Sequence, residues 1–330
     1  MRDIAITALI LGALPFVLRR PQLGVLMYVW ISVMNPHRLT WGFAYELPFA
    51  QILAVATLVG VLLTREAKWP PMNSLTLGLI LFVAWTGVST ATALYPADSF
   101  VRWVDLMKTQ LMVFLVLMLF HRKEDVRLLV WVIALSIAFY GVKGGIFTMV
   151  TGGVSRVYGP MNSLIGDNTS IGVAIIMAIP LLYYLQLTTP WRSVRWLLFG
   201  AILLCGVGVL GTYSRGALVA VCAIGIFLWW RGRHKIAILI ALLLAAPLGL
   251  ALMPEKWYER MDTIVNYEED SSANMRLNSW TTMFNLAKDR ALTGGGFDAG
   301  SKEVYERYAP DPSRPPQTAH SIYFQALGEH

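Results

Sequence analysis

Residues 128–150 read LLVWVIALSIAFYGVKGGIFTMV, an apolar run in which Lys143 is the only charged residue. A helix needs about 20 mostly apolar residues to cross a bilayer, and an open strand cannot satisfy its backbone there. This stretch therefore predicts a transmembrane helix. Similar apolar runs occur at 4–18, 22–34, 48–64, 75–94, 106–120, 170–187, 196–213, 216–230 and 236–253. The sequence thus predicts an all-α, polytopic transmembrane helical bundle of about ten spans over residues 1–253.

The composition excludes a soluble domain. Hydrophobic residues make up 56% of the 330 residues and charged residues only 14%, whereas a soluble domain carries about 25% charged residues. The net charge of +7 does not indicate nucleic-acid binding, because the cations lie in short loops between apolar runs. Cys205 and Cys222 lie inside such runs and predict free thiols.

The loops alternate in positive charge, which predicts the side of the membrane that each one faces. One alternating set of loops contains twelve Lys or Arg residues and the other set contains six. Cytoplasmic loops carry the excess of Lys and Arg, so the first set is predicted to be cytoplasmic. The poorer set contains Arg2, Arg38, Arg102, Lys108, Arg156 and Arg215. Residues 254–330, which follow the last run, are then predicted to form a periplasmic helical segment.

Helical spacing within this segment predicts helices over 255–267 and 272–292. The second would place Met275, Trp280, Phe284 and Ala287 on one face. Thr293–Gly296 should end it, since glycine readily adopts the positive φ that follows a helix. Thr318 is predicted to cap a last helix that starts at Ala319 and holds His320 in its first turn.

Near the N-terminus, Arg19-Arg20-Pro21 interrupts a long apolar stretch, which predicts either two short crossings or one broken crossing. No small-residue cleavage site follows the first run. We therefore expect a retained membrane segment and not a secretory signal.

Two cations at membrane depth require an explanation. Lys143 lies well inside its run, where a cation costs roughly 2.5–3.5 kcal/mol. We therefore expect Lys143 either to form a structural ion pair with another span or to be part of an anion site. The glycines that flank it would let a backbone or a ligand approach closely. Arg215 lies between two runs with almost no loop, so its guanidinium should meet a partner at the outer membrane surface. That partner is either a phosphate, which suits the planar fork of arginine, or a lipid headgroup.

The other candidates are weaker when taken singly. Arg276 on its own could be a solvated arginine, and a lone histidine such as His320 is more often structural. In the first turn of a helix, however, the helix dipole would keep the His320 imidazole neutral and able to accept a proton. Arg156 and Asn168 belong to the loop 151–169, whose glycines and proline predict an ordered loop at the mouth of a site.

Several motifs recur in the order and spacing of a known superfamily. They are Met1–Asp3, Met34–Tyr45, Tyr140–Gly145, Tyr158–Pro160, Asp167-Asn168, Ser214–Gly216, Arg276–Trp280, Gly294–Phe297 and His320–Gln325. Together they resemble the O-antigen ligase and O-antigen polymerase superfamily over essentially the whole chain. The resemblance is closest to the O-glycosylation ligases associated with exosortase A systems in exopolysaccharide biosynthesis.

The resemblance implies a glycosyltransferase of the bacterial inner (cytoplasmic) membrane that needs no metal or other cofactor. Such an enzyme takes a glycan from an undecaprenyl diphosphate carrier and passes it to an acceptor hydroxyl on the periplasmic side. The resemblance assigns Arg215 and Arg276 to the diphosphate and His320 to the role of base. We add Lys143, Arg156 and Asn168 as substrate-binding candidates. Direct displacement by the acceptor predicts inversion at the anomeric carbon.

Ligase and polymerase remain open alternatives, since they differ only in whether the acceptor is a lipid, a protein or another glycan. A transporter of the lipid-linked glycan is a third hypothesis, although the sequence shows no paired broken spans of the kind typical of transporters. Members of the superfamily continue through further spans. We therefore expect the sequence to be part of a longer chain.

Overall fold

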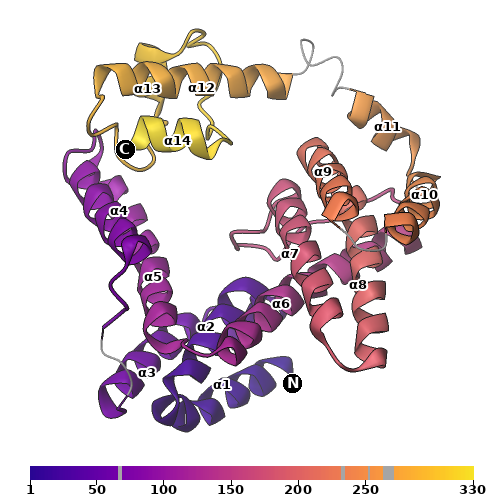
Figure 1. The fold of residues 1–330 in the computed structure, drawn as a ribbon. Helices are drawn as coiled ribbons and strands as arrows, with labels where there is room; N and C mark the ends of the chain where they lie inside the picture. The colour runs from indigo at the N-terminus through magenta and orange to yellow at the C-terminus, as the bar shows by residue number, and fades with distance from the viewer. Residues whose placement is uncertain (66–68, 232–234, 252, 263–270) are drawn as a thin grey trace. The chain divides into compact units, whose positions relative to one another are not determined.

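Each of the ten apolar runs forms a helix in the computed structural model, which describes residues 1–65, 69–231, 235–251, 253–262 and 271–330 (Figure 1). In chain order these helices are α1 (Arg2–Arg19), α2 (Pro21–Met34), α3 (Phe49–Leu63), α4 (Ser74–Ala91), α5 (Pro96–Leu119), α6 (Lys123–Val150), α7 (Asn168–Thr188), α8 (Arg192–Gly211), α9 (Arg215–Arg231) and α10 (Lys235–Ala251). Two short 3-10 helices, η1 (Pro36–Leu39) and η2 (Phe43–Tyr45), follow α2. The described residues contain no strand, so the all-α fold class is confirmed.

Four of the described helices are long and apolar enough to cross a membrane. They are α4, α6, α7 and α8. Helices α2 and α3 are apolar but shorter. Transmembrane helices are thus supported, whereas the number of about ten spans remains a prediction.

The chain divides into two units. Unit 1 comprises Met1–Glu66 and Leu119–Ile264, and unit 2 comprises Ala67–Met118 and Val265–His330. Besides the helices already given, unit 1 contains α11 (Glu255–Asp262), and unit 2 contains α12 (Ser271–Asp289), α13 (Lys302–Tyr308) and α14 (Ile322–Glu329).

In unit 1, α7 packs against α6 and α8 through a fully buried row of side chains that includes Ile171, Ile175 and Leu182. Helices α6 and α8 come unusually close because α6 carries glycines at the contact. A Cβ atom on Gly145 would lie 2.1 Å from the Leu204 carbonyl oxygen. The glycines beside Lys143 therefore allow the backbone of a neighbouring helix to approach. The sequence had predicted the close approach of either a backbone or a ligand. This contact holds Lys143 on a firmly packed helix.

A second core of unit 1 joins α1, α2 and α3 around Ile10, Ile31 and Leu53. Arg20 separates α1 from α2, and Pro21 is the first residue of α2. Proline suits this position because the first helical N–H has no intrahelical acceptor. The interrupted stretch therefore forms two separate helices.

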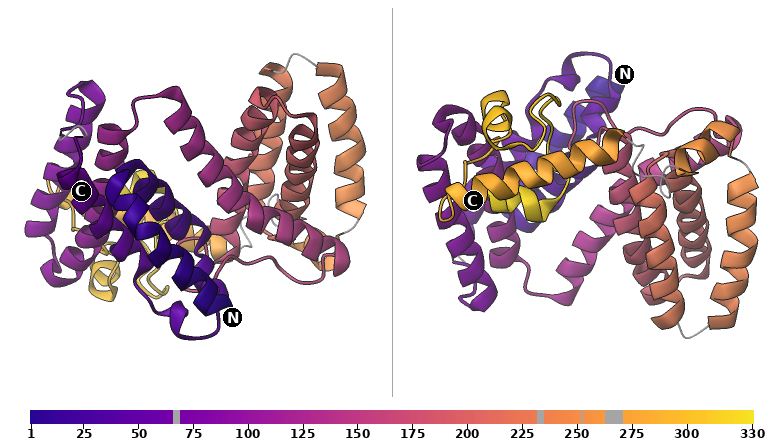
Figure 2. Two further views of the ribbon diagram at one scale, coloured as in Figure 1. Left: turned by 90° about the horizontal axis from the view of Figure 1, so that it is seen from below. Right: turned by 90° about the horizontal axis from the view of Figure 1, so that it is seen from above.

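In unit 2, α14 lies alongside α12 (Figures 1 and 2). A Cβ on Gly328 would lie 2.6 Å from the Met283 sulfur, so the two helices are in close contact. Helix α4 joins them through the end of α14, since Ser89 Oγ lies 2.6 Å from His330 Nδ1. In unit 2, the end of α14 is thus fixed to α4.

Two expectations for the helix predicted over 272–292 need correction. Helix α12 ends at Asp289 and not at residue 292, although Gly294 and Gly296 do adopt φ values of 57° and 84°. Its buried face includes Met283 and Leu286, whereas Phe284 is 43% exposed, so the predicted apolar face is wrong in part. The short helix α13 was not predicted. Of the predicted helix 255–267, Glu255–Asp262 is helical and residues 263–267 lie outside the described residues.

Candidate functional site

A cationic cavity of about 980 Å³ lies within unit 1. Four cations line it, namely Arg2 from α1, Arg38 from η1, Lys143 from α6 and Arg156 from the loop before α7. Two of the predicted substrate-binding residues, Lys143 and Arg156, therefore line one cavity. Among the described residues, none forms an ion pair with Lys143, and its predicted part in an anion site stays a prediction.

The loop that carries Arg156 is ordered, as predicted. A Cβ on Gly159 would lie 1.7 Å from the Ile165 carbonyl oxygen, so the loop folds back on itself in a way that only glycine permits. Asp167 caps α7, because its Oδ1 accepts hydrogen bonds from the N–H groups of Thr169 and Ser170 at 2.8 and 2.9 Å. The loop is thereby fixed at its bend and at its end.

Asn168 and Arg156 both reach the turn that precedes Arg215. The Asn168 side-chain amide donates to the Thr212 carbonyl at 2.8 Å. The guanidinium carbon of Arg156 lies 5.4 Å from the ring centroid of Tyr213. The predicted residues Arg156, Asn168 and Arg215 therefore cluster around one turn of unit 1, and Asn168 holds the backbone of that turn.

The turn before Arg215 has a strained backbone that a side-chain hydrogen bond holds in place. Tyr213 adopts φ 58°, and its hydroxyl donates to the Gly153 carbonyl at 2.6 Å. Arg215 follows as the half-buried first residue of α9. The N-terminus of a helix is a favourable place for an anion, because its free N–H groups and the helix dipole attract negative charge.

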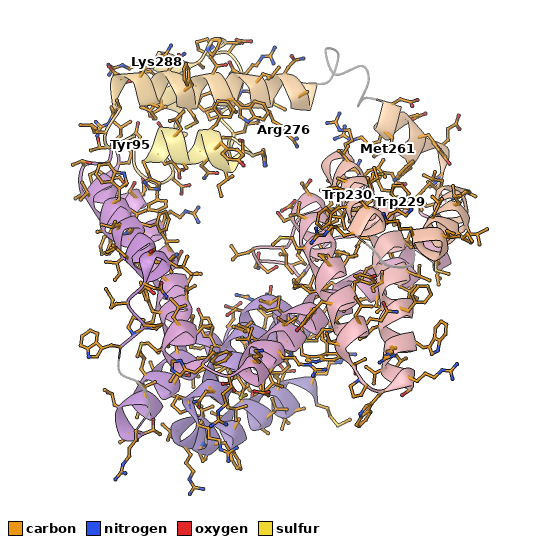
Figure 3. All side chains as sticks on the ribbon, viewed as in Figure 1. Tyr95, Trp229, Trp230, Met261, Arg276 and Lys288 are labelled. Carbon is orange, nitrogen blue, oxygen red and sulfur yellow. The ribbon has the colours of Figure 1, made fainter. Side chains whose placement is uncertain are left out.

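In unit 2, Trp280 connects α12 to the segment that carries His320. Its indole Nε1 donates to the Ala319 carbonyl at 2.6 Å, and its ring stacks on Phe324 with centroids 5.1 Å apart. Arg276 lies one turn before Trp280 and therefore on the same face of α12. Figure 3 shows Arg276 on the side of α12 that faces α14. The Trp280 contact thus brings Ala319, the residue before His320, to the face of α12 that carries Arg276.

The position of His320 differs from the prediction. Helix α14 begins at Ile322, with Ser321 as its N-cap residue, so Thr318 is not the cap and His320 is not in the first helical turn. The Trp280 bond fixes Ala319, and His320 then turns the chain at φ 48°. His320 is consequently exposed, and its Nε2 lies 3.3 Å from Thr318 Oγ1. The prediction that His320 lies in the first turn of a helix is therefore wrong.

The comparisons with known proteins divide the chain in two. Residues 1–189 match a family of unknown function, DUF5935. The chain belongs to this family. Residues 200–330 match the O-antigen ligase family, which supports the O-antigen ligase superfamily and a membrane ligase or glycosyltransferase role. No curated protein and no solved structure matches the chain.

The two matched regions hold different parts of the candidate site. Arg215, Arg276 and His320 all lie in the O-antigen ligase match, and the cationic cavity is lined entirely from the DUF5935 match. The apolar helices and the ligase match together indicate a bacterial membrane protein. Arg215 belongs to unit 1, whereas Arg276 and His320 belong to unit 2. Their convergence on one cavity remains a prediction.

Sequence reasoning missed two contributors to the cavity. Arg2 and Arg38 were counted among the cations of the outer loops, and they lie within the Met1–Asp3 and Met34–Tyr45 motifs, but neither was predicted to bind substrate. Their joint position depends on tertiary contacts. Asp3 Oδ1 accepts hydrogen bonds from the N–H groups of Gly42 and Ala44 at 3.1 Å each, which brings the start of α1 to the segment after η1.

Glu329 is a buried carboxyl group that the sequence did not single out. It is 7% exposed in α14, and burial raises its pKa to about 7 from an ordinary value of 4.5. The Gln325 side chain donates to it at 3.1 Å. The folded state therefore favours the protonated carboxyl group.

Glu329 should make unit 2 less stable as the pH rises. Because its folded pKa is raised, its stabilising contribution is full below pH 4.5 and is lost as the pH rises to about 7. The loss should amount to about 3 kcal/mol at most. Thermal unfolding in detergent should show wild-type protein losing stability over this range relative to Glu329→Gln. Parallel pH profiles for the two proteins would refute the assignment.

Proposed function

We propose that the chain transfers a glycan from an undecaprenyl diphosphate carrier to an acceptor hydroxyl at the periplasmic face of the bacterial inner membrane. The observation that carries this proposal is the O-antigen ligase match over residues 200–330, which contains Arg215, Arg276 and His320. Each of these side chains can perform one part of such a transfer.

The local geometry supports the proposed roles. Arg215 stands at the N-terminus of α9, where guanidinium and backbone N–H groups can meet a diphosphate together. Trp280, one turn after Arg276, binds the carbonyl of Ala319, the neighbour of His320, which supports a shared place for Arg276 and His320. An exposed histidine at a chain turn is accessible to an acceptor, which a buried one would not be.

The reaction follows from these groups. The acceptor oxygen attacks the anomeric carbon while His320 takes its proton. The bond from that carbon to the diphosphate oxygen breaks, and the lipid diphosphate leaves with the bonding electron pair. Arg215 and Arg276 hold the charge that grows on the leaving oxygens, which stabilises the transition state more than the ground state. Attack opposite the leaving group inverts the configuration at carbon.

The remaining candidates act on substrate binding. Lys143 and Arg156 line the cationic cavity, and Asn168 orders the turn that presents Arg215. The partners are the lipid-linked donor, a lipid, protein or glycan acceptor, and the surrounding membrane lipids. The chemistry needs only a base and fixed cations, so the proposal includes no cofactor and no nucleic acid.

Release of undecaprenyl diphosphate tests this proposal. The donor is lipid-linked glycan extracted from cells that lack the gene, mixed with the purified chain in detergent and with acceptor fractions from the same cells. We expect the free lipid diphosphate to appear together with glycosylated acceptor. Absence of release with every acceptor fraction would refute the proposal.

The products separate the alternatives. A ligase modifies a lipid or protein fraction, whereas a polymerase lengthens the lipid-linked glycan itself. A transporter moves the donor across reconstituted vesicles and leaves its diphosphate bond intact. Release in detergent, where no membrane separates two compartments, therefore supports an enzyme over a transporter.

A further inference from the structure

We propose that the cationic cavity of unit 1 binds an acidic saccharide, a sugar bearing carboxylate or phosphate groups. This inference deepens the proposed function and rests on it for the role of the saccharide as a substrate. The cavity is lined only by residues of the DUF5935 region, and none of them takes part in the proposed bond-breaking step.

The charge of the cavity selects an anion. Arg2, Arg38, Lys143 and Arg156 line it, and none of the described residues that line it is acidic. Asp3, beside Arg2, is engaged with the backbone of Gly42 and Ala44. The cations come from four separate segments. A ligand that satisfies them must therefore be extended or carry more than one anionic group.

Two of the guanidinium groups are held in position by aromatic rings. The Arg38 guanidinium carbon lies 4.6 Å from the ring centroid of Tyr45, and Arg156 lies 5.4 Å from that of Tyr213. An arginine stacked in this way keeps the N–H groups of its edge free for in-plane hydrogen bonds. Carboxylate and phosphate accept such bonds in pairs. Stacking also reduces the entropy that a ligand must remove on binding.

The rest of the lining suits sugar rings. Trp41 is 93% exposed and Tyr158 is 59% exposed, and both border the cavity. Aromatic faces pack against the C–H faces of a pyranose, while the hydroxyl groups stay solvated at the open side. The volume of about 980 Å³ is far larger than a single diphosphate group requires. Charge, exposed aromatic rings and size together favour an acidic saccharide.

Binding is measured first with the purified full chain, without donor or acceptor. The probes are a trigalacturonate, glucose 6-phosphate, and the neutral trisaccharide that matches the first probe. We expect saturable calorimetric binding of at least one anionic probe and none of the neutral one. Lys143→Gln and Arg38→Gln should each weaken binding by roughly tenfold or more, and Lys143→Arg should largely restore it. Arg192→Gln, an exposed cation outside the cavity, is the matched control.

A second measurement uses only wild-type protein, so that it stands if a variant fails to fold. The anionic probe should protect the Lys143 amine from acetylation, and the neutral trisaccharide should not. Equal binding of neutral and anionic probes, or no binding of either, would overturn the proposal. So would protection of Lys143 by phosphatidylglycerol in nanodiscs that the anionic probe cannot displace, because the cavity would then hold a lipid headgroup.

Inhibition kinetics identify the source of the saccharide. An anionic probe that raises the KM for the lipid-linked donor occupies the place of the donor glycan, and one that raises the KM for the acceptor occupies the acceptor's place. Binding without any transfer activity would refute the proposed function alone. Transfer without probe binding would refute this inference alone.

Discussion

Replacing His320 by alanine should lower the rate of glycan transfer by about 10²- to 10⁴-fold, the usual contribution of a general base. Binding of undecaprenyl diphosphate should remain, because the proposed diphosphate contacts come from Arg215 and Arg276. The rate is measured as undecaprenyl diphosphate released per minute at saturating donor and acceptor. Donor affinity is measured separately on the same preparation.

The backbone conformation at His320 decides which substitution tests the base role with the least strain. Its φ of 48° lies in the left-handed region, which asparagine tolerates better than alanine. His320→Asn therefore removes the base with less strain, and both variants should lose the same activity. His121→Ala, at another exposed histidine, is the control. Near-normal turnover by His320→Asn would exclude the base role.

Arg215→Lys should reduce kcat/KM for the donor by roughly 10- to 100-fold, although it preserves the charge. Lysine is a point charge and cannot donate two parallel hydrogen bonds to a diphosphate. The turn is held independently by the Tyr213–Gly153 and Asn168–Thr212 hydrogen bonds, so we expect the fold to persist.

The matched control is Arg192→Lys, which makes the same substitution at the first residue of α8. That variant should leave kcat/KM for the donor unchanged. If Arg215→Lys also transfers glycan at the wild-type rate, the arginine does not grip the diphosphate, and a lipid headgroup contact becomes the better explanation.

Features encoded in one stretch of sequence were predictable. The apolar runs became helices, Pro21 began α2, and the glycines after α12 adopted positive φ, because each depends on residues close together in the chain. The glycines beside Lys143 were also understood as permitting close approach. These signals are local, so no knowledge of the tertiary fold was needed.

Features set by tertiary contacts were not predictable in the same way. The Trp280–Ala319 hydrogen bond joins residues 39 positions apart and displaces His320 from the helix that was expected to hold it. Arg2 and Arg38 join Lys143 only because Asp3 binds the segment after η1. Helix α13 has only seven residues, too few to show a helical period of hydrophobic residues. The local feature that could have indicated its start is the capping residue Ser301.

In the proposed reaction, this chain breaks the bond between a glycan and its lipid diphosphate. The most direct test is the detergent assay with purified donor, run with acceptor present and with acceptor omitted. We predict acceptor-dependent release of undecaprenyl diphosphate in equal amount to the glycosylated product, at a rate about 10²- to 10⁴-fold lower in His320→Asn. Donor that stays intact with wild-type protein and acceptor, or is consumed equally by His320→Asn, would contradict the claim.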